Sequence, residues 1–488
     1  MYLKGLIDGV NSARIAGGFT DGWETVWVEG LSDDSRYVRQ GDLFFCRVGA
    51  NYDTHEFAEE VKRRGAVALV CEREVQVALP QILVDDCREA MSLIASAFYG
   101  NPSQRLRIVG ITGTNGKTTT SYLLASILRA AGKRVGIIGT LGIFYGRKSI
   151  APELTTPDPI FLQKTLADMV QEGVQYVVME VSAHALYFKK DAPIRYAACI
   201  FTNLSQDHLD FFGTMQAYAE TKEWLFTPKK CDLCILNGDD DLGRKIGEKR
   251  EKGVFYYGLD TPSDAFAIVE REGLDGYDMV LNILDDVGRV RLSMTGRHNV
   301  YNALAAATCA RMLGISMESI RQGLQEIRGV KGRLEWVAEY RGAQIFVDFA
   351  HTPDGIEKSL SALRKHTKGR LICLFGCGGN RDKSKRPLMG ERVAQAADFA
   401  ILTSDNPRYE DPMDIISAIE KGYRRYSTAY AIIPDREKGI EYAIDHLLPS
   451  DVLLVAGKGG EYYQEIMGIK YLLSDDDIIK TYVGGRRE

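Results

Sequence analysis

The segment TGTNGKTTT (residues 112–120) decides how the middle of this sequence folds. It follows the apolar run RIVGI (residues 107–111) and opens a helical stretch that ends at Gly132, so it predicts a strand, a tight turn and a helix. Gly113 and Gly116 would let backbone N–H groups face phosphate oxygens, and the helix N-terminus would add partial positive charge. The segment therefore predicts a phosphate-binding loop, with Lys117 at the β and γ phosphates and the Thr118 hydroxyl at Mg²⁺.

One position of this loop departs from the general phosphate-loop pattern. Ile111 stands where the first glycine is usual, and Gly110 comes one place too early. The strand, turn and helix context still favours nucleotide binding, because a purely structural turn would leave Lys117 and three threonines without a role. The loop alone does not separate a kinase, a switch GTPase, a transport ATPase and a ligase.

The rest of the chain reads as an α/β protein of three domains. Residues 1–103 predict a small mixed α/β domain, and the Gly- and Pro-containing stretch YGNPSQ (99–104) predicts a linker. Residues 104–332 alternate strands and helices, which predicts a central phosphate-loop domain with a mostly parallel sheet. Residues 333–488 repeat the alternation and predict a Rossmann-like domain. Ligands bind outside the carboxyl ends of strands in such sheets, and the unusual residues cluster at those ends.

Composition narrows the class of protein. The net charge of -5 gives no reason to expect a nucleic acid or an acidic membrane surface as partner. The first residues lack the apolar core of a secretory signal, and no stretch approaches the ~20 apolar residues of a membrane helix. The nine cysteines are scattered, which indicates reduced thiols and a cytoplasmic protein. Cys231 and Cys234 have zinc-like spacing, but their apolar surroundings favour buried structural thiols.

Three further residues could carry chemistry. Glu180 ends the apolar run VVME, and its hard carboxylate oxygens suit Mg²⁺. His208 follows TNLSQD and could instead be a structural, hydrogen-bonded histidine. Lys222 lies in the helical stretch YAETKEWLF, where a lone lysine is usually a solvated surface residue.

Longer motifs resemble one family, the Mur ligases of peptidoglycan synthesis, and most closely their MurE type. The resemblance runs nearly end to end. It rests on DDSRYVRQGDLFF (33–45), TGTNGKTTT (112–120), LTTPDP (154–159), MEVSAHAL (179–186), FTNLSQDHLDFFGTM (201–215), GRHNVYNALAA (296–306), VDFAHTPD (347–354), GGNRDKSKRPLMG (378–390), DNPR (405–408) and GKGGE (457–461).

The resemblance implies an ATP-dependent amide ligase of peptidoglycan precursor synthesis, expected to be a cytoplasmic monomer. ATP would phosphorylate the free carboxylate of UDP-N-acetylmuramoyl-L-Ala-D-Glu, and the amine of meso-diaminopimelate would attack the acyl phosphate. A carboxylate is a poor electrophile, and phosphorylation both removes its charge and creates a leaving group. Transfer of phosphoryl between two anions needs neutralisation, which Mg²⁺ and Lys117 would provide.

The family's functional residues carry over by motif. Thr118 and Glu180 would bind one Mg²⁺, and His208 a second with Lys222 as a carbamate. Neutral amine reacts with CO₂, so a partly desolvated lysine suits that modification. Lys117, Lys222 and His208 form the expected catalytic set. ATP would contact Gly113, Thr114, Asn115, Gly116, Lys117, Thr118, Thr119, Asn299, Arg333 and Asp348, and the UDP substrate would contact Ser35, Ala50, Asn51, Tyr52, Thr155, Thr156, Ser182 and Lys190.

The incoming amino acid would be read by the third domain. The resemblance assigns it to Arg381, Asp405, Asn406, Pro407, Arg408, Gly457 and Glu461. In this family the DNPR form resembles enzymes that add meso-diaminopimelate rather than lysine. Diaminopimelate has one carboxylate more than lysine, and the planar fork of Arg408 can bind a carboxylate through two hydrogen bonds.

Four positions differ from the family pattern. Gly460 replaces a histidine, Phe188 and Lys190 replace a Gln-x-Arg pair that grips the substrate, and Phe349 replaces a tyrosine. Two alternatives therefore stay open beside the diaminopimelate ligase. One is a Mur-like ligase for lysine, another amine or another carboxylate acceptor, and the other is a phosphate-loop ATPase or binding protein that has lost ligation.

Overall fold

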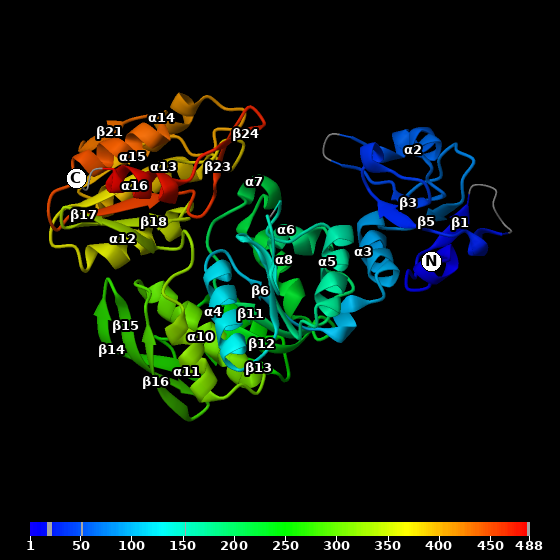
Figure 1. The fold of residues 1–488 in the computed structure, drawn as a ribbon, viewed down its shortest axis with the longest axis horizontal. Coiled ribbons are helices and arrows are strands. Elements are labelled where there is room, and N and C mark those ends of the chain that lie inside the picture. The colour runs from blue at the N-terminus through cyan, green and yellow to red at the C-terminus, as the bar shows by residue number, and fades with distance from the viewer. Residues whose placement is uncertain (17–21, 50–51, 152, 486–488) are drawn as a thin grey trace. The chain divides into compact units, whose positions relative to one another are not determined.

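The computed structural model describes residues 1–16, 22–49, 52–151 and 153–485 (Figure 1). Its elements form two compact units. The first contains residues 1–110, 133–197 and 227–232, and the second contains residues 111–132, 198–226 and 233–488. The predicted α/β class is confirmed, whereas the predicted boundaries at residues 103 and 332 stay predictions. Ala50 and Asn51 lie outside the described residues.

The N-terminal segment forms a five-stranded sheet in the order β1-β5-β4-β3-β2. Among the described residues of this sheet, only β1 and β5 pair antiparallel, and the other neighbouring strands are parallel. Side chains alternate between two cores. Leu43 and Phe45 pack with α1 and α3 on one face, and Phe44 packs with α2 on the other. The elements are α1 (Leu3–Ile7), β1 (Arg14–Ala16), β2 (Gly30–Ser32), β3 (Asp42–Phe45), α2 (Ala58–Arg64), β4 (Ala68–Cys71), β5 (Gln81–Leu83) and α3 (Cys87–Phe98), with 3-10 turns at Trp23–Thr25, Ser35–Tyr37 and Thr54–Phe57.

The central sheet has the strand order β16-β15-β14-β13-β12-β11-β6-β10-β7-β8-β9. The pairs β10–β7, β12–β13 and β13–β14 are parallel, as the alternation of strands and helices predicts. Its two ends are antiparallel hairpins, β7-β8-β9 and β14-β15-β16.

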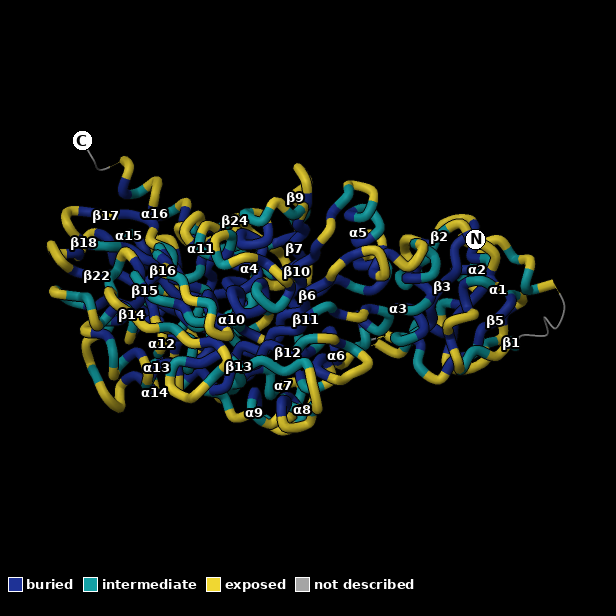
Figure 2. Tube along the Cα trace, turned by 90° about the horizontal axis from the view of Figure 1, so that it is seen from below, coloured by how far each residue is buried: buried dark blue, intermediate teal, exposed yellow. Residues whose placement is uncertain are grey.

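The central strands are β6 (Arg107–Thr112), β7 (Val135–Gly139), β8 (Gly142–Tyr145), β9 (Lys148–Ile150), β10 (Tyr176–Glu180), β11 (Tyr196–Phe201), β12 (Cys231–Asn237), β13 (Val254–Tyr257), β14 (Ala265–Gly273), β15 (Gly276–Ile283) and β16 (Asp286–Leu292). The helices are α4 (Lys117–Ala130), α5 (Pro159–Gln171), α6 (Ala183–Tyr187), α7 (Leu209–Phe212), α8 (Met215–Glu223), α9 (Asp241–Glu248), α10 (Arg297–Met312) and α11 (Met317–Glu326), with 3-10 turns at Pro102–Arg105 and Trp224–Phe226. In Figure 2 the tube is largely dark blue along β6, β10 and β12, as expected for strands in the interior of a covered sheet.

The C-terminal segment is a three-layer sandwich around a six-stranded sheet, β17-β18-β22-β19-β20-β21. Phe346 and Cys373 face α12, α13 and α14, while Ile345 and Ile372 face α15 and α16. This alternation follows from the two-residue repeat of a strand covered on both faces. The elements are β17 (Glu335–Tyr340), β18 (Ala343–Asp348), α12 (Pro353–Arg364), β19 (Leu371–Phe375), α13 (Lys385–Ala396), β20 (Phe399–Leu402), α14 (Pro412–Tyr423), β21 (Tyr430–Ile432), α15 (Arg436–Asp445), β22 (Val452–Ala456), β23 (Tyr463–Ile466), β24 (Ile469–Leu472) and α16 (Asp475–Gly484).

A buried ion pair ties two strand ends of this sandwich together. Arg436 and Asp475 have fully buried side chains joined at 2.7 Å. The Arg436 guanidinium also donates to the carbonyl oxygens of Ser404 at 3.3 Å and Ala456 at 3.0 Å. These carbonyls precede the DNPR and GKGGE segments, so the pair helps to fix both.

Replacing Arg436 by methionine should lower the free energy of unfolding of this region by about 3–5 kcal/mol, because it leaves the Asp475 carboxylate buried without a counter-charge. Urea denaturation of the full chain measures the loss. The matched control is Arg424→Met, since Arg424 is largely exposed in its pair with Glu420 and should cost no more than about 1 kcal/mol. Equal losses in the two variants would contradict the role given to the buried pair.

Candidate active site

The predicted phosphate loop is present between β6 and α4. Gly113 and Gly116 have φ angles of 144° and 87°, which disfavour other residues. Each also has no room for a side chain. A Cβ atom would lie 1.9 Å from the Thr202 hydroxyl at Gly113 and 2.4 Å from the Asn302 amide oxygen at Gly116. The glycines therefore serve both the turn and its close packing, and they leave the loop's N–H groups at the start of α4.

Two lysines meet at one carbonyl oxygen of this loop. Lys117 Nζ donates to Gly113 O at 2.9 Å and to Thr114 O at 2.8 Å. Lys222, more than 100 residues later in α8, donates to the same Gly113 O at 3.0 Å. Two lysine amines therefore meet at one atom of the loop, where Lys117 supplies a positive charge suited to an anion.

Lys222 is not the surface lysine that its helix suggests. Its side chain is buried, and Nζ lies 4.4 Å from the centre of the Tyr218 ring. Burial lowers the pKa of Lys222 well below its ordinary value, and the charge of Lys117 lowers that pKa further, while Asp207 opposes the change. A lowered pKa increases the share of the neutral amine, which is the form that reacts with CO₂.

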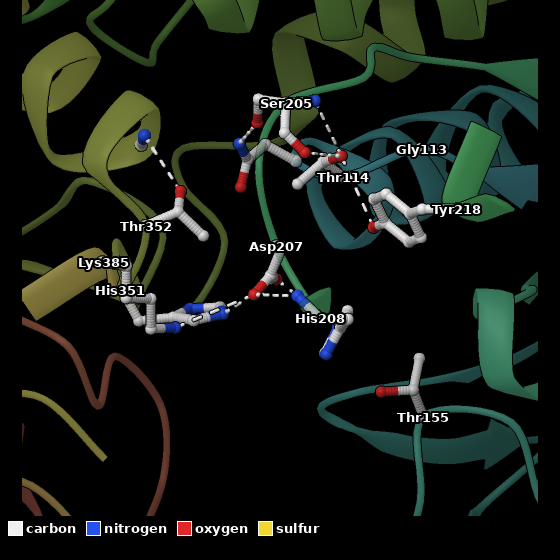
Figure 3. Close-up of polar contacts among 12 residues, drawn as sticks. Gly113, Thr114, Thr155, Ser205, Asp207, His208, Tyr218, His351, Thr352 and Lys385 are labelled. Carbon is white, nitrogen blue, oxygen red and sulfur yellow. Dashed lines mark hydrogen bonds and ion pairs between the residues drawn. The ribbon is translucent and has the colours of Figure 1, made fainter. Parts of the chain in front are cut away.

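A hydrogen-bond network holds the segment after β11 against the loop (Figure 3). Ser205 N donates to the Thr114 hydroxyl at 3.0 Å, and that hydroxyl donates back to Ser205 O at 3.1 Å. The Tyr218 hydroxyl lies 3.5 Å from the Thr114 hydroxyl. The network connects three segments distant in sequence, and it fixes the chain that leads directly into Asp207 and His208.

Asp207 gathers three basic side chains. His208 Nε2 lies 3.4 Å away, His351 Nε2 3.7 Å and Lys385 Nζ 3.7 Å, as Figure 3 shows. Burial alone would raise the pKa of Asp207, but His351, Lys385 and His208 outweigh it and lower that pKa well below its usual value. Asp207 is therefore a charged anchor for two basic side chains of the C-terminal segment, His351 and Lys385.

Arg333 connects the C-terminal segment to the first turn of α4. Its guanidinium donates to the Thr118 hydroxyl at 3.0 Å and lies 4.3 Å from the centre of the Phe349 ring. The substitution of tyrosine by Phe349 therefore keeps the ring face on which Arg333 rests. Asp348, also predicted to reach the nucleotide, is buried and accepts a hydrogen bond from Ser359.

Asn299 is buried at the start of α10, where its amide donates to Thr295 O at 2.7 Å. Asn302 donates to the Asn299 side-chain oxygen at 3.1 Å and accepts from Thr120 at 3.3 Å. Asn302 thus joins the expected adenine contact to the phosphate loop. Asn115 bonds Asp354 at 3.1 Å, and Thr119 is buried in α4.

In the first unit, Glu180 lies buried at the end of β10. Its two carboxylate oxygens each accept from Thr140 at 3.0 Å, one from the N–H and one from the hydroxyl. A Cβ at Gly139 would come within 2.2 Å of Glu180, so the neighbouring strand must carry glycine there. Thr140 also bonds Thr155 at 3.1 Å.

The residues predicted for the UDP substrate lie in the same unit. Thr156 donates to Glu180 O at 2.9 Å and accepts from Ser182 N at 3.1 Å. Ser35 begins a 3-10 turn, and Tyr52 is largely exposed. Lys190 is nearly buried and forms an ion pair with Asp158 at 2.8 Å.

The DNPR and GKGGE segments pack together at the ends of β20 and β22. The Asn406 amide donates to Glu461 at 2.9 Å and accepts from the buried Lys458 at 3.1 Å. Gly457 has a φ of 113°, and a Cβ there would lie 2.6 Å from Asp405. Buried Pro407 completes the loop that presents Arg408.

Arg408 itself is partly buried and bonded. Its guanidinium donates to Gly379 O at 2.7 Å and pairs with Glu465 at 3.2 Å. Arg381 is exposed, and both arginines approach Gly378, where a Cβ would lie 3.0 Å from Arg408 Nη1 and 3.7 Å from Arg381 Cγ. Both arginines therefore border Gly378.

All nine cysteines are buried free thiols, which agrees with the structural interpretation of Cys231 and Cys234. Among the described residues, no group of three or more His, Cys, Asp or Glu side chains is arranged to hold a metal ion. Within the same residues, no helix has both the length and the apolar character needed to cross a membrane.

The fold and the loop together define a phosphate-loop α/β enzyme in which a second, buried lysine meets the loop. Three family models match: the Mur ligase family catalytic domain at residues 28–99, the Mur ligase middle domain at 111–310, and the Mur ligase glutamate ligase domain at 332–459. The chain belongs to the Mur ligase family, and the predicted resemblance is confirmed.

Several curated relatives of this chain share one name. It is 41% identical to the UDP-N-acetylmuramoyl-L-alanyl-D-glutamate--2,6-diaminopimelate ligase of Geobacillus thermodenitrificans, covering 91% of this chain and 92% of the relative. It is 40% identical to the ligase 1 of that name from Clostridium acetobutylicum, with 99% of each covered. A solved structure of a protein of this name has 30% identity and a TM-score of 0.69, covering 96% of this chain and 97% of the other.

Several residues of the site were not predicted from the sequence. Asn302, Asp207, Tyr218, His351 and Lys458 all lie within or next to the quoted motifs, but their partners are distant in sequence. Their positions in or beside long motifs were the one feature of the sequence that could have identified them as site residues. The sequence does not show which of these motifs contact one another in the folded chain, so their contacts could not be predicted.

Proposed function

We propose that this protein joins meso-diaminopimelate to UDP-N-acetylmuramoyl-L-Ala-D-Glu, consuming ATP and releasing ADP and phosphate, in peptidoglycan precursor synthesis. The names of relatives that are 40–43% identical over nine-tenths or more of the chain support this activity. The structural observation that carries the proposal is the meeting of Lys117 and Lys222 at the carbonyl oxygen of Gly113. A nucleotide switch needs the first lysine but has no use for the second.

Each lysine has a separate task in this proposal. Lys117 carries its charge to the β and γ phosphates and stabilises the charge that develops as phosphoryl moves from ATP to the substrate carboxylate. Lys222 is carbamylated, so that the buried amine becomes a carboxylate. Arg333, resting on Phe349 beside the Thr118 hydroxyl, brings a further cation from the C-terminal segment to the nucleotide.

The predicted metal ligands are Thr118, Glu180, His208 and the carbamate of Lys222. A hydroxyl and two carboxylate-type groups are oxygen donors of the kind that Mg²⁺ prefers. When bound, Mg²⁺ would neutralise the triphosphate. The contacts of Thr140 hold the Glu180 carboxylate in one orientation.

At the amine end, Asn406, Lys458 and Glu461 form a rigid network that supports Arg408. The guanidinium of Arg408 would bind the carboxylate that distinguishes diaminopimelate from lysine, with Arg381 beside it. Addition of lysine, another amine or another carboxylate acceptor is the second candidate, favoured by the substitutions Phe188 and Gly460.

Release of phosphate by the purified protein should require ATP, the UDP-muramoyl dipeptide and meso-diaminopimelate together, with lysine a far poorer amine. A coupled phosphate assay measures this, and hydroxylamine should trap an acyl phosphate when the amine is withheld. Phosphate release that is independent of the dipeptide would indicate an ATPase, and equal rates with both amines would reject the diaminopimelate assignment.

We further propose that the chain acts as a monomer in the cytoplasm. The family resemblance and the small, polar substrates support this proposal. Sedimentation at micromolar concentration in the presence of the substrates tests the oligomeric state, and a stable dimer would contradict it.

A further inference from the structure

Two substitutions of the family pattern lie next to each other in the first unit. Phe188 and Lys190 stand where relatives of the family grip the substrate with glutamine and arginine. Lys190 forms an ion pair with Asp158 at 2.8 Å, with only 11% of its side chain exposed. The charge of Lys190 is therefore largely balanced inside the protein, and Phe188 cannot hydrogen-bond to an anion.

Arg88, in the first turn of α3, lies against this altered segment. Its guanidinium carbon is 4.8 Å from the centre of the Phe188 ring. One terminal nitrogen donates to the carbonyl oxygen of Val48 at 3.0 Å. An arginine has five N–H donors, so these two contacts hold the planar group in place and leave most of its donors for another partner.

The cations around Arg88 are paired with carboxylates. Arg47 pairs with Asp33 at 2.7 Å, and Lys189 lies 2.5 Å from Glu89. Among the described residues, no Asp or Glu lies within ion-pair distance of Arg88. Arg88 is thus the one basic side chain of this cluster, within that part of the chain, whose charge no neighbouring carboxylate balances.

The position of Arg88 is fixed by backbone contacts. The Ser92 hydroxyl, one turn further along α3, donates to the carbonyl oxygen of Lys189 at 2.7 Å. Lys189 adopts a left-handed conformation with φ of 51°, which turns that carbonyl towards the helix. The start of α3 is therefore fastened to the 188–190 segment, and Arg88 is preorganised rather than mobile.

We propose that Arg88 binds the diphosphate of the UDP-muramoyl substrate. It supplies the positive charge and hydrogen-bond donors for the substrate that the substitutions at 188 and 190 remove. This inference rests on the proposed function. Arg88 contacts Val48, which in sequence precedes the 50–52 segment assigned to the uridine end. It also contacts Phe188, at the far end of the short helix α6 from Ser182 and two residues before Lys190, both assigned to the muramoyl dipeptide. The diphosphate is the group that connects those two ends of the substrate, and a guanidinium matches its geometry.

The test is the kinetics of Arg88→Ala and Arg88→Lys with the UDP-muramoyl dipeptide. Alanine should raise KM for that substrate by about 10- to 100-fold, leaving kcat and KM for ATP within about twofold. Lysine should give an intermediate KM, because it keeps the charge without the fork. Phe188→Leu should raise KM by only a few-fold, since it removes the ring face and keeps a bulky apolar side chain.

Binding of UDP and of UMP to the same variants separates the diphosphate from a carboxylate. The wild type should bind UDP more tightly than UMP, and Arg88→Ala should lose most of that ratio. An unchanged ratio with a raised KM would assign Arg88 to the dipeptide carboxylate and overturn the proposal, as would an unchanged KM. The control is Arg63→Ala, an exposed arginine on α2 that should behave as wild type.

Turnover by the wild type tests the proposed function separately from the role of Arg88. If the wild type fails to turn over the UDP-muramoyl dipeptide, the proposed function fails. The UDP and UMP affinities still report on Arg88 in that case, because they need no reaction.

Discussion

Replacing Lys222 by alanine is expected to lower ligation by about three orders of magnitude, while leaving ATP binding largely intact. The carbamate would be lost, and with it one of the groups predicted to hold a cation where charge develops in phosphoryl transfer. Lys117 would keep its contacts to the Gly113 and Thr114 carbonyl oxygens. The loss should therefore appear in kcat far more than in the affinity for the nucleotide.

The same variant offers a chemical rescue. Alanine leaves a cavity next to the Tyr218 ring, and a small carboxylate such as formate or acetate can enter it and supply the missing anion. Partial recovery of phosphate release with rising carboxylate concentration is the expected result. Lys222→Met fills the cavity, so it should be equally inactive but should not be rescued.

Lys249→Ala is the matched control, because Lys249 is an exposed lysine paired with Glu223 of the same helix as Lys222. It should retain full activity. Turnover near the wild-type level in Lys222→Ala would show that the buried amine only supports the loop. Loss of ATP binding in both Lys222 variants would point to damage of the fold, and Lys222→Met is the more informative of the two because it preserves packing.

The sequence was informative wherever local chemistry decides local structure. Gly113, Gly116 and Lys117 predict the phosphate loop because the turn, the close approach and the charge are all encoded in nine consecutive residues. The shift of the first glycine to position 110, with Ile111 at the usual glycine position, does not change the loop. Ile111 is a buried residue of β6, so the turn starts only at Gly113.

The antiparallel edge of the central sheet was missed for an equally local reason. The turn between β15 and β16 uses Leu284 and Asp285, with φ angles of 49° and 68°. Such hairpin turns are usually signalled by Asn-Gly or Asp-Gly, because positive φ disfavours a side chain like leucine. Without that signal, the strands Gly276–Ile283 and Asp286–Leu292 are hard to recognise as a hairpin.

At the candidate active site, sequence-based prediction failed for a different reason. Burial of Lys222 could not be predicted, since YAETKEWLF has the polarity of an exposed helix. Its environment is made by Gly113 and Tyr218, of which the first is 109 residues away. Likewise, Phe349 looks like the loss of a hydroxyl until Arg333 is found against its ring. Residue type and spacing identify candidates, and tertiary contacts decide their electrostatics.

Arg408→Ala should remove most of the preference for meso-diaminopimelate over lysine. The kcat/KM for meso-diaminopimelate is expected to fall about 100-fold, which corresponds to about 3 kcal/mol, the range of a hydrogen-bonded charge pair. The kcat/KM for lysine should change little or rise, because lysine no longer faces a partly buried guanidinium that it cannot satisfy. Arg392→Ala, an arginine on α13 that is partly exposed in its pair with Glu357, is the control and should leave both values unchanged.

The contacts of Arg408 make the result interpretable. Its backbone N–H donates to Glu465 O at 3.0 Å, and its carbonyl oxygen accepts from Met467 N at 2.7 Å, so a side-chain change leaves the loop's main-chain bonds in place. Glu465 pairs with the guanidinium at 3.2 Å, so a substrate carboxylate has to share or displace that partner. An equal loss for both amines would mean that Arg408 only holds Glu465 and β23 in position. A loss confined to diaminopimelate requires that the guanidinium meets the carboxylate that lysine lacks.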